Sequence, residues 1–111
     1  MSTDFSQVVE MTERENMKQP AVYIVSNFQR TVFYTGVTSN LVQRIWQHKE
    51  GAVEGFTKRY QCKYLLYYEL ADNMESAIIR EKQIKDYRRE KKKVLIEGMN
   101  PEWKDLYESI L

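Results

Sequence analysis

Two tyrosines, an arginine and a histidine follow one another closely in the first half of the sequence. Tyr23 and Tyr34 each stand in an apolar run rich in β-branched residues, and Arg44 and His48 lie four residues apart beyond them. That spacing is about one helical turn, so Arg44 and His48 are expected beside each other on one helix face. A guanidinium stabilises charge on a phosphate, and a phenol or an imidazole can take a proton from water. These residue types together favour phosphoryl chemistry.

Each of these residues also has an ordinary explanation. Strands favour tyrosine, and this chain has eight of them. A lone helical histidine is usually a polar surface residue or a hydrogen-bonded core residue, and a lone arginine is usually exposed. The residue types therefore indicate a reaction class without establishing it.

Glu81 is the carboxylate that draws attention in the second half of the sequence. It stands between Ile78 and Ile84 in an expected helix, on or beside the buried face. Burying an unpaired charge is costly, so this carboxylate needs a partner. Mg²⁺ commonly binds through one or two carboxylates together with water and phosphate oxygens. The sequence has no Gly-rich phosphate loop and no Cys/His zinc spacing.

Turn residues and apolar patterns predict the elements that position these side chains. Strands are expected at 21–26 and 31–37, joined by a hairpin, and a third at 64–70 reads as the central strand, buried on both faces. Helices are expected at about 41–49, 74–89 and 94–99, with Asn40 and Asn73 as N-caps and Gly51 as a C-terminal stop. A last helix is expected to begin at Asn100 as N-cap, with Pro101 in its first turn.

The apolar residues of the 41–49 helix predict which of its faces is buried. Two pairs spaced four residues apart form the expected stripe, namely Leu41 with Ile45 and Val42 with Trp46. Arg44 and His48 are then expected at the margin of this stripe.

Length and composition favour one small globular domain. The chain has 111 residues, 42% of them hydrophobic and 13% aromatic, with a formal net charge of +1. No apolar run is long enough to cross a bilayer, and residues 1–18 lack a signal-peptide pattern. The single cysteine, Cys62, excludes an internal disulfide and is consistent with a reducing compartment. We expect a cytoplasmic protein without a membrane partner, with a flexible leader at 1–19 and a domain at 20–108.

Positive charge gathers in one stretch despite the nearly neutral total. Residues 80–93 contain eight lysines and arginines against three acidic residues. Such a stripe can neutralise phosphates, although a solvated helix face with local ion pairs is the ordinary interpretation. The nucleic-acid-binding candidates are Lys82, Lys85, Arg88, Arg89 and Lys58.

Several ordered motifs resemble the GIY-YIG nuclease family. The first motif stands as Ala-Val-Tyr at 21–23 and the second as Tyr-Thr-Gly at 34–36, with Arg44 and His48 at the spacing of the family. Ala-Val and Thr35 depart from the family letters but leave both tyrosines and Gly36 in place. The phrases at 55–60, 80–83 and 99–103 resemble those of small stand-alone bacterial members, so the similarity covers about residues 20–108.

The resemblance implies a small α/β (α+β) domain with a central three-stranded antiparallel sheet flanked by helices. It also implies metal-dependent hydrolysis of DNA phosphodiester bonds, in DNA repair or recombination, with Mg²⁺ or Mn²⁺ as the cofactor. Glu81 would be the metal ligand, and Arg44 would bind the scissile phosphate.

The resemblance assigns the remaining polar positions to the same site. Tyr23 and Tyr34 would line the centre, and one of them would activate or orient the attacking water. His48 would assist as a base or proton relay, and Asn100 would brace the site. Two alternatives stay open: a nucleic-acid-binding module with little catalysis, and a catalytic subunit that depends on a targeting protein.

Overall fold

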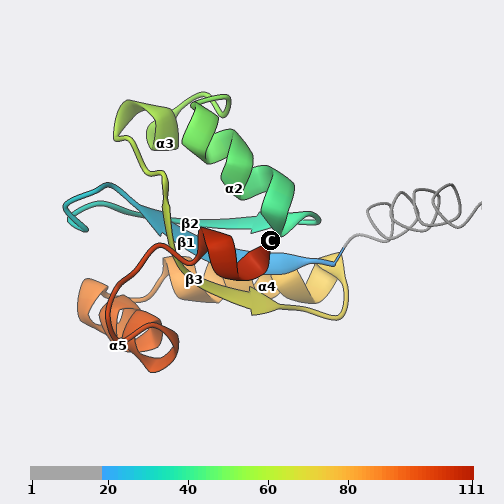
Figure 1. The fold of residues 1–111 in the computed structure, drawn as a ribbon. Helices are drawn as coiled ribbons and strands as arrows, with labels where there is room; N and C mark the ends of the chain where they lie inside the picture. The colour runs from blue at the N-terminus through green and yellow to red at the C-terminus, as the bar shows by residue number, and fades with distance from the viewer. Residues whose placement is uncertain (1–18) are drawn as a thin grey trace, which may run out of the picture.

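A three-stranded antiparallel sheet in the order β2-β1-β3 forms the centre of the domain (Figure 1). Strand β1 spans Ala21–Ser26, β2 spans Phe33–Thr38 and β3 spans Tyr64–Leu70. The computed structural model describes residues 19–111, so the leader expected at 1–19 lies outside the described residues apart from Gln19. The predicted fold class is confirmed, whereas the domain limits at 20–108 stay a prediction.

Helices cover both faces of this sheet (Figure 1). One face packs against α2 and the short C-terminal helix η1, and the other packs against α4 and α5. The helical elements in chain order are α2 Leu41–Glu50, α3 Phe56–Arg59, α4 Met74–Lys85, α5 Arg89–Met99 and η1 Tyr107–Ile110. None of the helices in the described part of the chain has the length and apolarity needed to span a membrane.

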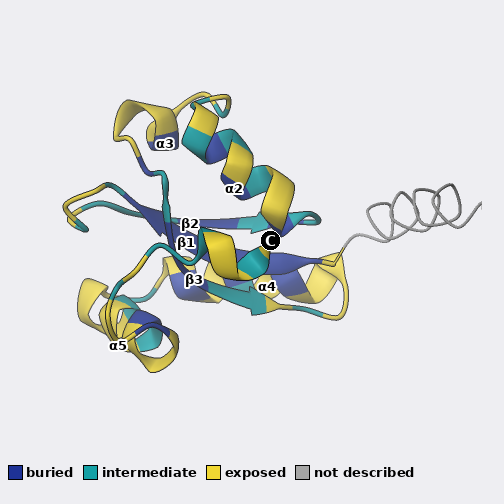
Figure 2. Ribbon diagram, viewed as in Figure 1, coloured by how far each residue is buried: buried dark blue, intermediate teal, exposed yellow. Residues whose placement is uncertain are grey.

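Strand β1, and not β3, is the central strand, which corrects the prediction. All six residues of β1 are buried (Figure 2). The long apolar run of β3 arises because both of its faces are covered: Leu65 faces the α2 side and Leu66 faces the α4 side. The outer edge of β3 bonds to the C-terminal segment, where the Leu106 N–H donates to the Leu65 carbonyl at 2.8 Å.

Three predicted helix boundaries are wrong. The helix expected at 74–89 ends at Lys85, and α5 begins at Arg89 and includes the piece expected at 94–99. No helix begins at Pro101. Asn100 is the C-cap of α5, and its backbone N–H donates to the Ile96 carbonyl at 2.7 Å. The chain then turns through Trp103, whose φ is 58°.

The side chain of Asn100 explains why this segment is a turn. Its amide donates to the Leu66 carbonyl at 3.1 Å and to the Lys104 carbonyl at 2.7 Å, and its oxygen accepts from the Lys104 N–H at 3.0 Å. These bonds fasten the segment after α5 to β3. An Asn-Pro pair predicts a helix start from local sequence, but here the long-range bonds to β3 determine the backbone.

The caps that depend on local sequence are confirmed. The Asn40 side chain accepts from the Gln43 N–H at 3.1 Å, and the Asn73 side chain accepts from the Ser76 N–H at 2.8 Å. Gly51 ends α2 with a φ of 71°, a conformation that glycine adopts without a steric penalty.

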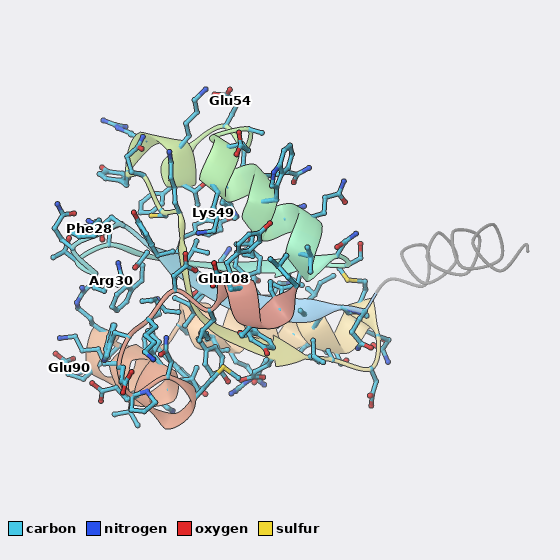
Figure 3. All side chains as sticks on the ribbon, in the orientation of Figure 1. Phe28, Arg30, Lys49, Glu54, Glu90 and Glu108 are labelled. Carbon is cyan, nitrogen blue, oxygen red and sulfur yellow. The ribbon has the colours of Figure 1, made fainter. Side chains whose placement is uncertain are left out.

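The β1–β2 hairpin is fastened to the rest of the domain at its tip, where Figure 3 labels Phe28 and Arg30. The Arg30 guanidinium donates to the Trp103 carbonyl at 3.1 Å and lies 4.8 Å from the centre of the Tyr64 ring. This double contact holds the hairpin, and with it the start of β2, against the C-terminal half of the chain.

Candidate active site

The Tyr23 phenol lies directly over the backbone of Gly36. The two residues are paired across β1 and β2, and a Cβ at Gly36 would stand 2.4 Å from the Tyr23 oxygen. Atoms at that distance overlap, so only glycine leaves room for this ring. Tyr23 is fully buried, and its hydroxyl reaches across β2 because the neighbouring residue has no side chain.

His48 on α2 meets this hydroxyl. The Tyr23 oxygen and His48 Nε2 are 2.8 Å apart, and the exposed fraction of His48 is 3%. His48 is therefore part of the buried face of α2 with Leu41 and Ile45, not at its margin. The expected stripe residues Val42 and Trp46 point outward, with exposed fractions of 38% and 51%.

Burial keeps both members of the Tyr23–His48 pair neutral. It raises the pKa of Tyr23 to about 12, and the adjacent positive charge of Arg44 opposes that rise. Burial, reinforced by the Arg44 charge, lowers the pKa of His48 to about 4. Moving a proton from the phenol to the imidazole would cost on the order of 10 kcal/mol at this separation of pKa values. His48 is better suited to hold the Tyr23 hydroxyl than to take its proton.

Arg44 and Tyr34 complete the sheet side of the site. Arg44 is half-buried on α2, one turn before His48, and its charge acts on both members of the buried pair. The Tyr34 ring from β2 lies 6.5 Å from the Tyr23 ring and 6.1 Å from the His48 ring, between ring centres. Tyr34 is partly exposed, so it is the phenol of the two that solvent can reach.

Glu81 approaches from α4, which packs against β1 and β2. Its exposed fraction is 8%, and its negative charge contributes to the raised pKa of Tyr23. Its partner is Lys85, whose Nζ is 2.7 Å from Glu81 Oε2 and 6.0 Å from the centre of the Tyr34 ring. The buried carboxylate predicted from the sequence therefore has its counter-charge one turn along the same helix.

A divalent cation at this site would depend on Glu81. Within residues 19–111 there is no group of three acidic, histidine or cysteine side chains that could hold a metal ion. A single carboxylate nevertheless fits Mg²⁺ or Mn²⁺ when phosphate oxygens and water supply the other ligands. The Lys85 ammonium meets this carboxylate at Oε2.

Asn100 is not brought to these groups by any of its side-chain bonds. As described above, its bonds go to the backbone of Leu66 on β3 and of Lys104. The bracing that the resemblance implies is therefore bracing of the segment after α5, and a direct role in the chemistry stays a prediction.

The nucleic-acid-binding candidates have different surroundings. Lys82 and Arg88 are exposed, and Lys58 pairs with Glu54, which Figure 3 labels, at 3.2 Å. Arg89 has a structural task, because it donates to the Thr31 carbonyl at 2.8 Å and lies 4.2 Å from the centre of the Phe33 ring.

An aromatic row beside the site was missed in the sequence. Phe56 stacks on Tyr34 with ring centres 6.0 Å apart, and Tyr60 lies 4.7 Å from Phe56. We call Tyr34, Phe56 and Tyr60 the aromatic row. Phe56 and Tyr60 have exposed fractions of 45% and 42%, and the Arg59 guanidinium lies 5.7 Å from the Tyr60 ring centre. The row depends on α3, a short helix between α2 and β3 that carries Phe56.

Comparisons with known proteins identify relatives of this arrangement. A family model described as the GIY-YIG catalytic domain matches residues 19–94. A UPF0213 protein of Haloquadratum walsbyi is 36% identical over 76 residues, which cover 68% of this chain and 84% of that protein. A UPF0213 protein of Staphylococcus haemolyticus is 35% identical over 81 residues, covering 73% of this chain and 98% of that protein.

A solved structure supports the same fold. The solution NMR structure of a UPF0213 protein from Bacillus halodurans aligns with a TM-score of 0.51 and 23% identity, over 81% of this chain and 95% of that chain. The resemblance in the motifs is thus confirmed by a family match that spans the tyrosines, Arg44, His48 and Glu81.

Replacing Gly36 by alanine tests the contact with Tyr23. The new methyl group overlaps the phenol, so we expect Gly36→Ala to lower the free energy of unfolding by about 1–3 kcal/mol. Gly98→Ala is the matched control, because its Cβ meets nothing within 4 Å and alanine favours a helix. Denaturant unfolding measures both, and equal stability of Gly36→Ala and the wild type would contradict the contact.

The pH dependence of stability tests the neutral state of His48. Its pKa is about 4 in the folded chain and about 6.5 when unfolded, so the unfolded chain binds a proton first as pH falls. Neutral His48 thereby contributes roughly 3 kcal/mol to the free energy of unfolding. This contribution is fully present above about pH 6.5 and is lost as the pH falls towards 4. We expect the wild type to lose more stability over this range than His48→Gln. Parallel stability curves would show that His48 is not held neutral by folding.

Proposed function

The chain belongs to the GIY-YIG family, and from this premise we propose that it is a nuclease that hydrolyses DNA phosphodiester bonds with a divalent cation. The observation that carries the proposal is the convergence of Tyr23, Tyr34, His48 and Arg44 from β1, β2 and α2. Glu81 joins them from α4. We place the activity in DNA repair or recombination.

Arg44 and Glu81 have complementary tasks in this proposal. Arg44 binds the scissile phosphate, because a guanidinium offers several N–H donors and a positive charge to phosphate oxygens. Glu81 holds Mg²⁺ or Mn²⁺, which supplies positive charge for the developing negative charge on the phosphate. Arg44 already acts on the electrostatics of the Tyr23–His48 pair, which supports its place at the centre.

The two tyrosines differ in what they can do for the attacking water. Tyr23 is fully buried and its pKa is raised to about 12, so it is poorly suited to take a proton. Tyr34 is partly exposed and borders the Lys85 ammonium. We assign contact with the attacking water to Tyr34. Tyr23, held by His48, fixes the surroundings of Tyr34 and Arg44.

The aromatic row favours substrates with unpaired nucleotides. A base that is not stacked in a duplex can stack on an exposed aromatic ring, a contact worth about 1–3 kcal/mol. The row leads from Tyr34 in the site to Tyr60 at the surface, with Arg59 beside it to meet a phosphate. Single strands, flaps and branched junctions offer such nucleotides.

The main test is cleavage of labelled nucleic acids in the presence of Mg²⁺ or Mn²⁺. The panel contains duplex, single-stranded, flapped and branched DNA, and RNA. We expect wild-type cutting of DNA with unpaired nucleotides, and Arg44→Ala and Glu81→Gln to lose about 10²-fold or more in rate. Gln43→Ala, an exposed change on the same helix as Arg44, is the control and should cut normally.

Failure of the wild type to cut any member of the panel would contradict an autonomous nuclease. Retained binding would then support a nucleic-acid-binding module. Cutting that returns when a co-purified protein is added would support a partner-dependent catalytic subunit. Denaturant unfolding is the control for folding. Both variants, Arg44→Ala and Glu81→Gln, should unfold at the same denaturant concentration as the wild type, so that a loss of activity does not reflect a loss of stability.

The roles of the two phenols predict different effects of removing each hydroxyl. Tyr34→Phe removes the group that meets the water, so we expect kcat to fall about 10²-fold with little loss of stability. Tyr23→Phe removes the bond to His48, so we expect a loss of about 1–3 kcal/mol in stability together with a smaller fall in kcat. Single-turnover cleavage and denaturant unfolding measure the two effects. The reverse order of kcat values would assign the water to Tyr23.

A further inference from the structure

Lys85 stands where the carboxylate and the accessible phenol of the site meet. Its Nζ is 2.7 Å from Glu81 Oε2 and 6.0 Å from the centre of the Tyr34 ring. The Glu81 side chain is 10% exposed, whereas the Lys85 side chain is 50% exposed. The fixed member of this pair is thus the carboxylate, and the lysine approaches it from solvent.

The other cations of α4 are not in this position. Arg80 bonds to Glu69 through two of its nitrogens on the β3 side, and Lys82 is exposed. Among the ion pairs of the described residues, the one that includes Glu81 is formed with Lys85. A carboxylate this deeply buried needs a counter-charge, and Lys85 supplies it.

The same ammonium is in the way of a divalent cation. A cation bound to Glu81 would lie within a few Å of Nζ, where two positive charges repel each other strongly. Lysine has a long flexible stem and a single rotatable ammonium, so it can leave the carboxylate at small cost. A phosphate held by Arg44 beside the cation would offer the ammonium a new partner.

We propose that Lys85 is a built-in counter-ion of Glu81 that gives way to the divalent cation and moves to a phosphate of the nucleic acid. This inference rests on the proposed function, in which Glu81 holds the cation. Lys85 competes with the cation in the absence of nucleic acid and contributes to nucleic-acid binding in its presence. Cation and nucleic acid therefore strengthen each other's binding, because both favour the position in which the Lys85 ammonium has left Glu81.

Mn²⁺ binding without nucleic acid is the first part of the test, with free Mn²⁺ followed by electron paramagnetic resonance. We expect Lys85→Met to bind Mn²⁺ about three- to tenfold more tightly than the wild type, because one nearby positive charge is removed. Lys82→Met, on the same helix, is the matched control and should stay within about twofold. Glu81→Gln should lose the site. Lys85→Gln serves as a second, polar variant should the methionine protein fold poorly.

Binding of a single-stranded oligonucleotide in Ca²⁺ is the second part. We expect Lys85→Met to bind more weakly, with the slope of log K against log salt reduced by about 0.7 for one lost phosphate contact. The proposed role of Lys85 would be overturned if both Lys85 variants bound Mn²⁺ no more tightly than the wild type. If Glu81→Gln still lost Mn²⁺ binding in that case, the metal site itself would be retained. Absence of Mn²⁺ binding by the wild type and by both Lys85 variants would overturn both the role of Lys85 and the metal site.

Discussion

The close approach of the Tyr23 phenol to the backbone of Gly36 is the constraint on which the site depends. Tyr23 belongs to the central strand, so its ring would ordinarily be one more part of the core. It reaches across β2 to His48 because Gly36 has no side chain to stop it. One hydroxyl thereby connects β1 and β2 to α2, the helix that also carries Arg44.

The charged groups of the site are arranged around this neutral pair. Burial disfavours the charged forms of both the phenol and the imidazole, so they hold geometry without adding charge. Positive charge comes from Arg44 on α2, and negative charge comes from Glu81 on α4, balanced by Lys85. A phosphate and a cation would meet these outer groups and leave the buried hydrogen bond undisturbed. The division of tasks that we propose for the two tyrosines follows from the same difference in burial.

The sequence predicts what depends on local patterns and misses what depends on distant partners. The three strands and the caps at Asn40 and Gly51 follow from turn residues and apolar runs, and the family motifs supply the candidate site residues. An apolar run indicates burial on two faces but not which strand is central. The apolar spacing within the helix places His48 at the margin of the stripe, because the partner that buries it, Tyr23, is 25 positions away. Asn100 looks like a helix start until its bonds to β3 are known.

A crystal structure of Tyr34→Phe with Mn²⁺ and a phosphorothioate single strand would test the account most directly. The account predicts an anomalous manganese peak against the Glu81 carboxylate, with a DNA phosphate within reach of Arg44 and a base on the aromatic row. Manganese away from Glu81, or DNA phosphates on a different face of the domain, would contradict a catalytic centre built around Tyr23 and β2.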